Sequence, residues 1–290
     1  MTSLASKLKA GKFIVTSELT PPKGTDLTEL FAKADMLVDC VDAFNVTDSH
    51  NSRMSLAPIA AAHLILDRGV EPIVQMTTRD RNRIALQGDM LAAAALGIEN
   101  LVCMGGDPPH LGDHPDAKGV YDLSTMDLID AAQRLTKGED LAGNKVSASP
   151  TFNIGAVVNP GADDLDTEIE RLQQKAEAGA VFFQSQAIYD AERFAAFMER
   201  IAPLNVRVLA GILPVKSERM AKHMNENVPG IDIPESLVEQ IKSADNVKAT
   251  SAKLAADVIS AIKPICAGIH LMALGWEDQI PTILKLSDLQ

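Results

Sequence analysis

The chain has 290 residues, a length that fits either two ordinary domains or one large α/β domain. Hydrophobic residues make up 46% and charged residues 23%, so the chain can bury a full core, which excludes a disordered or collagen-like protein. The net charge of -12 and the low aromatic content of 4% argue against a nucleic-acid or anionic-membrane partner. A small molecule is therefore the expected ligand.

The three cysteines, Cys40, Cys103 and Cys266, are odd in number, lie in apolar contexts and lack CxxC spacing. This usage predicts reduced thiols that pack as small hydrophobic groups rather than a disulfide framework. The first thirteen residues hold basic side chains without an apolar stretch, and no run reaches the roughly 18 apolar residues of a membrane span. We therefore expect a cytoplasmic protein.

In the first half of the chain, short runs rich in Val and Ile alternate with longer segments of helical period. Strands are predicted at Phe13–Glu18, Ala43–Thr47, Glu71–Met76 and Leu101–Met104. Helices are predicted at about Asp26–Cys40, Leu56–Arg68, Arg81–Leu96 and Met126–Leu135. Long irregular segments are expected at Gly105–Ser124 and Thr136–Pro150.

The second half continues the alternation. Strands are predicted at Asn153–Val158, Val181–Ser185, Val206–Leu213 and Gly268–Met272. Helical segments are predicted at Asp163–Ala178, Ala191–Ala202, Ser217–Asn227, Glu235–Ser243, Ser251–Ala267 and Gln279–Leu286. In the first of these helices, Glu168, Arg171 and Lys175 follow one another at i+3 and i+4 spacing, which predicts a solvent-facing stripe.

Eight βα units without a linker or a break in composition predict a single (β/α)8 TIM barrel over residues 1–290. The alternative is a doubly wound parallel sheet. Such a sheet usually carries a glycine-rich turn after its first strand, whereas this strand ends in Glu-Leu-Thr-Pro-Pro. The barrel is therefore preferred.

Polar residues at the ends of the predicted strands are the candidates for function, because the carboxyl ends of barrel strands face the ligand. In chain order they are Glu18, Thr47, Gln75, Thr77, Gly105, Gly106, Asp107, Asn159, Gln184, Gln186 and His270. Glu18 is a candidate general acid, because its neighbours Leu19, Pro21 and Pro22 suggest an apolar setting that raises a carboxyl pKa. The competing interpretations are a capping role for Glu18 and a plain turn role for Asp107.

Other chemistries are weaker predictions. A glycine- and proline-broken loop offers possible metal ligands, but without thiolates or a defined face, at His110, Asp113, His114 and Asp116. Cys103 lies inside an apolar strand, and Ser49 next to His50 lacks a nucleophile elbow. No metal and no covalent nucleophile are therefore expected, and the site points to acid catalysis.

In this order, the strand-end motifs resemble the methylenetetrahydrofolate reductase family, which consists of flavin-dependent (β/α)8 barrels. The resemblance runs from about Gly11 to Leu286 and rests on the joint order of Ser17–Pro22, Asn45–Asp48, Gly106–Pro109, Ala178–Ala180 with Phe183–Gln186, and Gly211–Val215. Two further segments, Gly112–Asp122 and Gly268–Trp276, resemble the branch found in many bacteria and in anaerobic one-carbon pathways.

The resemblance implies reduction of 5,10-methylenetetrahydrofolate to 5-methyltetrahydrofolate, a step of one-carbon metabolism and methionine biosynthesis. It implies that NADH or NADPH passes hydride to a flavin and that the folate then takes it. By the family pattern, Glu18 is the acid and Asp107 tunes the flavin and the substrate cation. The flavin-contacting positions are Thr47, Gln75, Gly105, Gly106, Tyr121 and Lys175, and the substrate-contacting positions are Gln184, Gln186 and Met224.

The chain also departs from that pattern. The family's histidine on the third strand is Gln75 here, the arginine two residues before the aspartate is Gly105, and a stacking phenylalanine is Met224. FAD is the expected cofactor, with FMN or direct, flavin-free hydride transfer as alternatives. The alternative functions are a pterin-dependent methyltransferase barrel and a folate-binding subunit of a one-carbon complex. A homo-oligomer or a partner subunit is compatible with either.

Overall fold

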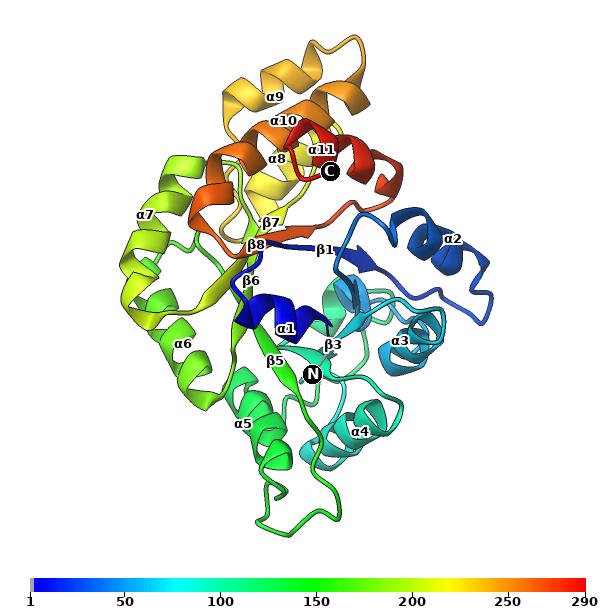
Figure 1. Ribbon diagram of the computed structural model, residues 1–290. Helices are drawn as coiled ribbons and strands as arrows, with labels where there is room; N and C mark the ends of the chain where they lie inside the picture. Colours follow the sequence, from blue (N-terminus) through cyan, green and yellow to red (C-terminus); the bar gives the residue numbers. More distant parts are fainter. Residues whose placement is uncertain (1–2) are drawn as a thin grey trace.

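A computed structural model describes residues 3–290 of the chain. Eight parallel strands form a closed barrel in the order β1 to β8, which confirms the (β/α)8 prediction (Figure 1). The strands are β1 (Ile14–Leu19), β2 (Ala43–Val46), β3 (Pro72–Thr77), β4 (Asn100–Met104), β5 (Asn153–Val158), β6 (Phe182–Ala187), β7 (Arg207–Ile212) and β8 (Gly268–Leu271). Each predicted strand is present, with ends displaced by no more than two residues.

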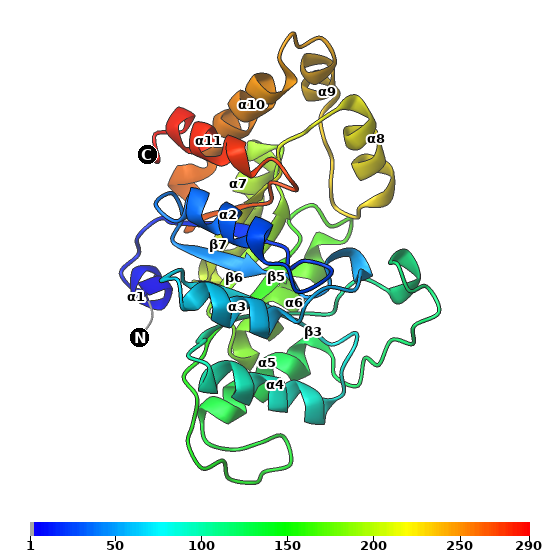
Figure 2. The same ribbon diagram turned by 90° about the vertical axis from the view of Figure 1, so that its right-hand side faces the viewer.

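Helices surround the barrel and follow its strands along the chain (Figures 1 and 2). They are α1 (Ser3–Lys9), α2 (Thr28–Leu37), α3 (Pro58–Leu66), α4 (Arg83–Ala95), α5 (Thr125–Thr136), α6 (Leu165–Ala178), α7 (Ala191–Ile201), α8 (Glu218–Asn227), α9 (Glu235–Lys242), α10 (Val247–Ile262) and α11 (Ile280–Leu286). The helix predicted at Ser251–Ala267 is present, but it begins and ends about four to five residues earlier, as α10. The Asn246 side chain caps α10 by accepting the Ala249 N–H, and the helix ends just before Pro264.

Side chains on each strand alternate between the barrel interior and the surrounding helices. On β1, Val15 and Leu19 belong to the large hydrophobic cluster shared with the helices, whereas Ile14 belongs to a separate cluster inside the barrel. Thr16 and Glu18 continue the inward series above Ile14. One strand therefore supplies an apolar side chain to one end of the barrel and a carboxylate to the other.

The amino-terminal end of the barrel is closed by an apolar plug. Its buried members are Leu4 and Leu8 of α1 together with Ile14, Ala43, Ile73, Val102, Phe182 and Leu209. The Phe182 ring occupies space next to Gly155, where an added Cβ would lie 2.3 Å from the ring atom Cζ. The helix α1 was not predicted, because its seven residues are too few to display a clear helical period.

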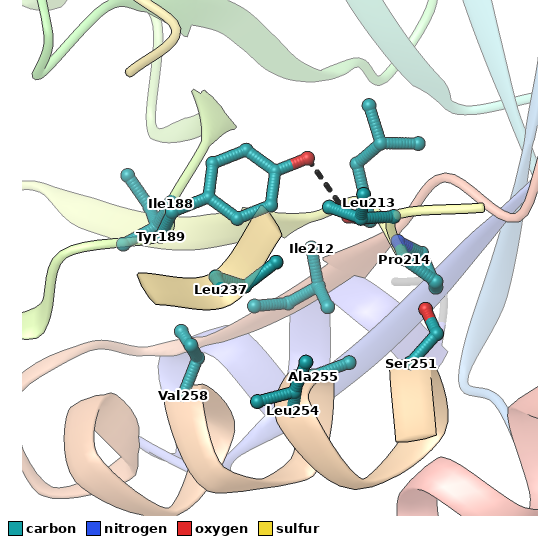
Figure 3. Close-up of a pocket in the computed structure, with 11 residues that line it drawn as sticks. Ile188, Tyr189, Ile212, Leu213, Pro214, Leu237, Ser251, Leu254, Ala255 and Val258 are labelled. Atoms are coloured by element: carbon teal, nitrogen blue, oxygen red, sulfur yellow. Dashed lines mark hydrogen bonds between the residues drawn. The ribbon is translucent and has the colours of Figure 1, made fainter. Parts of the chain in front are cut away.

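A smaller cluster on the flank supports α8 and α9, which lie next to each other in Figure 2. Its buried members include Leu213, Val215, Ala221 and Leu237, and Met220 and Met224 of α8 pack against it. A cavity of about 10 Å³ lies beside this cluster, between the end of β7 and α10 (Figure 3). Ser251 lines the cavity, and its buried hydroxyl has no hydrogen-bond partner within residues 3–290.

Candidate functional site

A cavity of about 480 Å³ opens at the carboxyl ends of the strands. Most of the residues predicted for the site line it: Glu18, Gln75, Gly105, Gly106, Asp107, Lys175, Gln184 and Gln186. His270 and Asn159, also predicted as strand-end residues, are part of the same lining. The volume lies within the range of about 300–1,000 Å³ that is typical of small-molecule sites.

Glu18 stands at the centre of a hydrogen-bonded group formed by β1, β3 and β8. Its Oε1 atom lies 3.3 Å from Nε2 of Gln75 and 3.4 Å from Nε2 of His270. The other ring nitrogen of His270, Nδ1, lies 2.9 Å from Oγ1 of the buried Thr16. His270 on β8 thus bridges Thr16 and Glu18, which are successive inward-facing residues of β1.

The prediction of a raised Glu18 pKa was wrong. Burial of the carboxyl does raise its pKa, but the hydrogen bond and charge of His270, the charge of His50 and the hydrogen bond from Gln75 lower it by more. The net pKa lies below the usual value. The neighbouring Leu19, Pro21 and Pro22 do not predict this effect, because the polar partners of Glu18 come from parts of the chain that are distant in sequence.

Gln184 and Asn45 form a reciprocal pair of amides beneath the cavity. Asn45 Nδ2 donates to Gln184 Oε1 over 2.6 Å, and Gln184 Nε2 donates to Asn45 Oδ1 over 2.9 Å. Both side chains are buried. Gln186, two residues further along β6, accepts the N–H of Ala187 through Oε1. Its amide nitrogen has no hydrogen bond within the described residues and is the freer donor of the two glutamines.

The prediction that Glu168 and Lys175 face solvent was wrong. Both are buried and line the cavity, whereas Arg171 is exposed. Glu168 Oε1 accepts the N–H of Asn159 over 2.9 Å, and Lys175 Nζ donates to the Val157 carbonyl over 2.7 Å. Their long side chains reach back from α6 to the end of β5. Burial lowers the pKa of Lys175 despite the nearby charge of Glu168.

The loop after β4 brings backbone close to the cavity. Gly106 has a φ of +84°, and an added Cβ would lie 3.0 Å from Cβ of Thr77, so a side chain there would be strained and crowded. Asp107 is exposed at the rim. Its carbonyl accepts hydrogen bonds from the Ser52 hydroxyl and the Arg79 guanidinium, which attach this loop to the loops after β2 and β3.

A buried network of charges next to the site was not predicted. Asp48 accepts hydrogen bonds from the N–H of Thr77 over 2.8 Å, from its hydroxyl over 3.0 Å and from Arg81. Arg79 is 2% exposed and pairs with Asp80. Asp48, Arg79, Asp80 and Arg81 follow the last residue of β2 or β3 by two to four positions, so they are not strand-end residues.

Four predicted residues lie outside the cavity lining, namely Thr47, Thr77, Tyr121 and Met224. Thr47 is buried, and its Oγ1 has no hydrogen-bond partner within residues 3–290. Tyr121 is 44% exposed, with a φ of +42°, on the same loop as Asp107. Met224 packs into the flank cluster from α8. In contrast, His50, Glu168, Ser185 and Met272 line the cavity and were not among the predicted site residues.

Of the two loop histidines, His114 takes part in a surface contact. Asp113 accepts hydrogen bonds from Lys23, from His114 Nδ1 and from the N–H of Met54. Within residues 3–290, no group of three or more His, Cys, Asp or Glu side chains is arranged to hold a metal ion. Nor does that part of the chain contain a helix with the length and apolar character needed to cross a membrane.

Comparison with known families gives a match over almost the entire chain. The family model for methylenetetrahydrofolate reductase matches residues 3–288. Methylenetetrahydrofolate reductase 2 of Schizosaccharomyces pombe is 24% identical over 311 residues, covering all of this chain and 47% of the yeast protein. The 5,10-methylenetetrahydrofolate reductase of Pectobacterium carotovorum is 25% identical over 254 residues, covering 86% of this chain and 79% of the bacterial one. This chain spans about half the length of the yeast relative.

Solved structures show the same fold at low sequence identity. A Clostridium thermocellum protein described as binding two copies of 5-methyl-5,6,7,8-tetrahydrofolic acid superposes with a TM-score of 0.68 and 16% identity. The match covers 99% of this chain and all of that one. A 2,3-dimethylmalate lyase superposes with a TM-score of 0.55 and 12% identity, covering 98% of this chain and 86% of the lyase.

Proposed function

The chain belongs to the methylenetetrahydrofolate reductase family, and from this premise we propose that it reduces 5,10-methylenetetrahydrofolate to 5-methyltetrahydrofolate with NADH or NADPH as electron donor. The observation that carries the proposal is the position of Glu18. Its carboxyl group lies in the cavity at the barrel mouth, where it is hydrogen-bonded through Oε1 to His270 and Gln75. Its Oε2 atom has no partner within residues 3–290 and is available to a substrate.

Residues around the cavity fit a flat heteroaromatic cofactor such as a flavin. Gly105 and Gly106 bring backbone to the rim of the cavity. Thr47 lies outside the lining, but its buried hydroxyl has no hydrogen-bond partner within residues 3–290, so a ligand atom that reached it would satisfy that group. Lys175 is the buried cation of the lining. When bound, a flavin would supply the capacity to accept hydride from the nicotinamide and deliver it to the folate. We propose FAD as this cofactor, with Thr47, Gly105, Gly106, Tyr121 and Lys175 as its contacts.

Glu18 acts as the general acid in this proposal. Opening the five-membered ring of the folate requires protonation of a ring nitrogen, and a carboxyl group at hydrogen-bond reach can supply that proton. Asp107, at the rim, would stabilise the resulting cation by its negative charge. Gln186 would donate a hydrogen bond to the substrate through its free amide nitrogen. Gln184 contributes indirectly, since both ends of its amide are bonded to Asn45.

The experiment separates the two hydride transfers. Protein saturated with FAD would be mixed with NADH, and the reduced protein would then be mixed with methylenetetrahydrofolate. We expect Glu18→Gln to retain flavin reduction and to slow the folate step by about 10²- to 10⁴-fold, the usual contribution of a general acid. Equal losses in both steps would remove Glu18 from the role of acid.

A titration of the purified protein with FAD and with FMN defines the cofactor. Submicromolar binding of either one supports the flavin mechanism. Folate reduction by NADH without binding of either flavin would establish direct hydride transfer instead. Folate binding with no reduction under any of these conditions would favour a methyltransferase or a folate-binding subunit.

A further inference from the structure

His270, which lies against Glu18, has a further role at the barrel mouth that follows from the state of the Glu18 carboxyl. A general acid must hold a proton when the substrate arrives, yet the Glu18 carboxyl is surrounded by groups that favour its ionised form. The proton therefore needs another location close by. His270, 3% exposed and 3.4 Å from Glu18 Oε1, is the titratable side chain that hydrogen-bonds this carboxyl.

Thr16 determines which protonation states of His270 can be satisfied. The Thr16 hydroxyl lies 2.9 Å from His270 Nδ1 and 3.4 Å from the Ile269 carbonyl. A hydroxyl that donates to the carbonyl accepts from Nδ1–H, and Nε2 then faces Glu18. In the doubly protonated ring both N–H groups have acceptors, namely Thr16 Oγ1 and Glu18 Oε1. The chain from Ile269 to Glu18 can thus hold a buried imidazolium with its hydrogen bonds complete.

We propose that Glu18 and His270 share one proton: His270 holds it at neutral pH, and Glu18 passes it to the substrate. This inference rests on the proposed function. In this transfer the Nε2–H bond of His270 breaks as an O–H bond forms on Glu18, and that O–H bond then breaks as an N–H bond forms on the substrate nitrogen. Glu18 is then a carboxylate facing the unprotonated Nε2 of His270. The lone pair of Nε2 and the carboxylate repel each other, which favours reloading by a proton from solvent.

His270 is therefore a positioning residue that acts through Glu18. Gln75 contributes a neutral hydrogen bond to the same Oε1 atom and leaves Oε2 for the substrate. The other charged or titratable groups that line the cavity lie on the loop after β2, the loop after β4 and α6: His50, Asp107, Glu168 and Lys175. Their charges influence the pair, but His270 alone among the described residues connects Glu18 to a buried hydroxyl.

The first test measures the folate step from pH 6 to 9 in wild type, His270→Gln and Thr16→Val, with Thr16→Ser as the matched control. We expect His270→Gln to slow this step about ten-fold or more at pH 8, since part of a general-acid contribution of about 10²- to 10⁴-fold is lost. The deficit should narrow toward pH 6, where solvent can protonate Glu18 directly. Thr16→Val should show a smaller deficit of the same kind, and Thr16→Ser should restore the wild-type profile.

The second test needs no substrate. Nitrogen-15 NMR of histidine-labelled protein, with the His270 signals assigned from His270→Gln, reports directly whether each ring nitrogen carries a proton. We expect a doubly protonated ring at pH 7 that becomes neutral in Glu18→Gln. A neutral His270 ring at pH 7, or a kinetic deficit that is the same at every pH, would overturn the shared proton. If wild type reduces no methylenetetrahydrofolate, the proposed function fails, and the NMR result still decides this inference.

Discussion

The two ends of the barrel are built from the same strands but have opposite chemistry. At the amino-terminal end, Ile14, Phe182 and Leu209 form a plug with α1 that excludes water. At the carboxyl-terminal end, the polar side chains of Glu18 and His270 line an open cavity. The change from one to the other takes four residues on β1, since Ile14, Thr16 and Glu18 are successive inward-facing positions.

This division separates the residues that stabilise the barrel from those that bind and react. Each inward-facing position near a strand's start can be optimised for packing, because the ligand meets only the positions near its end. A substitution in the plug should therefore change the free energy of unfolding and leave the site intact. A substitution at the mouth should do the reverse.

The strongest test of this separation is Phe182→Ala. Removing the ring leaves a cavity in the plug next to Gly155, and we expect the free energy of unfolding to fall by about 3–5 kcal/mol, the usual cost of a buried Phe→Ala change. Urea unfolding at constant ionic strength provides the measurement. Val181→Ala is the matched control, because the Val181 side chain is 53% exposed in the preceding position. A large change in the folate step of the folded variant would show that the two ends are coupled.

Gly105→Arg tests the opposite end. An added Cβ at Gly105 would have its nearest contact at 3.9 Å, with Thr125 Oγ1, so the rim has room for a side chain. A hydrogen bond from a cation to a flavin phosphate should tighten FAD binding by about 10- to 100-fold, equivalent to about 1.5–3 kcal/mol. The free energy of unfolding of the flavin-free protein should stay within about 0.5 kcal/mol of wild type.

Equilibrium titration with FAD gives the affinity, and Gly105→Gln controls for side-chain bulk without charge. Unchanged affinity in the arginine variant would mean that the phosphates of the cofactor do not pass this part of the rim. Tighter binding in both variants would assign the effect to packing.

The fold and most of the mouth could be predicted because they depend on local patterns. Val- and Ile-rich runs revealed the eight strands, and the polar residues that end them include Glu18, Gln75 and His270. The electrostatics could not be predicted in the same way. The lowered pKa of Glu18 depends on His270, 252 residues away in the chain, and the burial of Lys175 depends on how α6 packs on β5. Pairing across the closed barrel creates these contacts, and no local pattern encodes them.

The flank cluster belongs to neither end of the barrel, and a substitution beside it should cause the smallest change in the free energy of unfolding. The hydroxyl of Ser251 is buried, has no hydrogen-bond partner among residues 3–290, and lies beside a cavity that is about the size of one water molecule (Figure 3). In Ser251→Ala the desolvated hydroxyl is lost and the helix propensity of α10 improves, so we expect a gain of up to about 1 kcal/mol in the free energy of unfolding. Ser260→Ala is the control, because the Ser260 hydroxyl on the same helix donates to the Ala256 carbonyl. A loss of about 1 kcal/mol or more in Ser251→Ala would contradict this expectation. It would mean that the hydroxyl is hydrogen-bonded to a water molecule in the cavity.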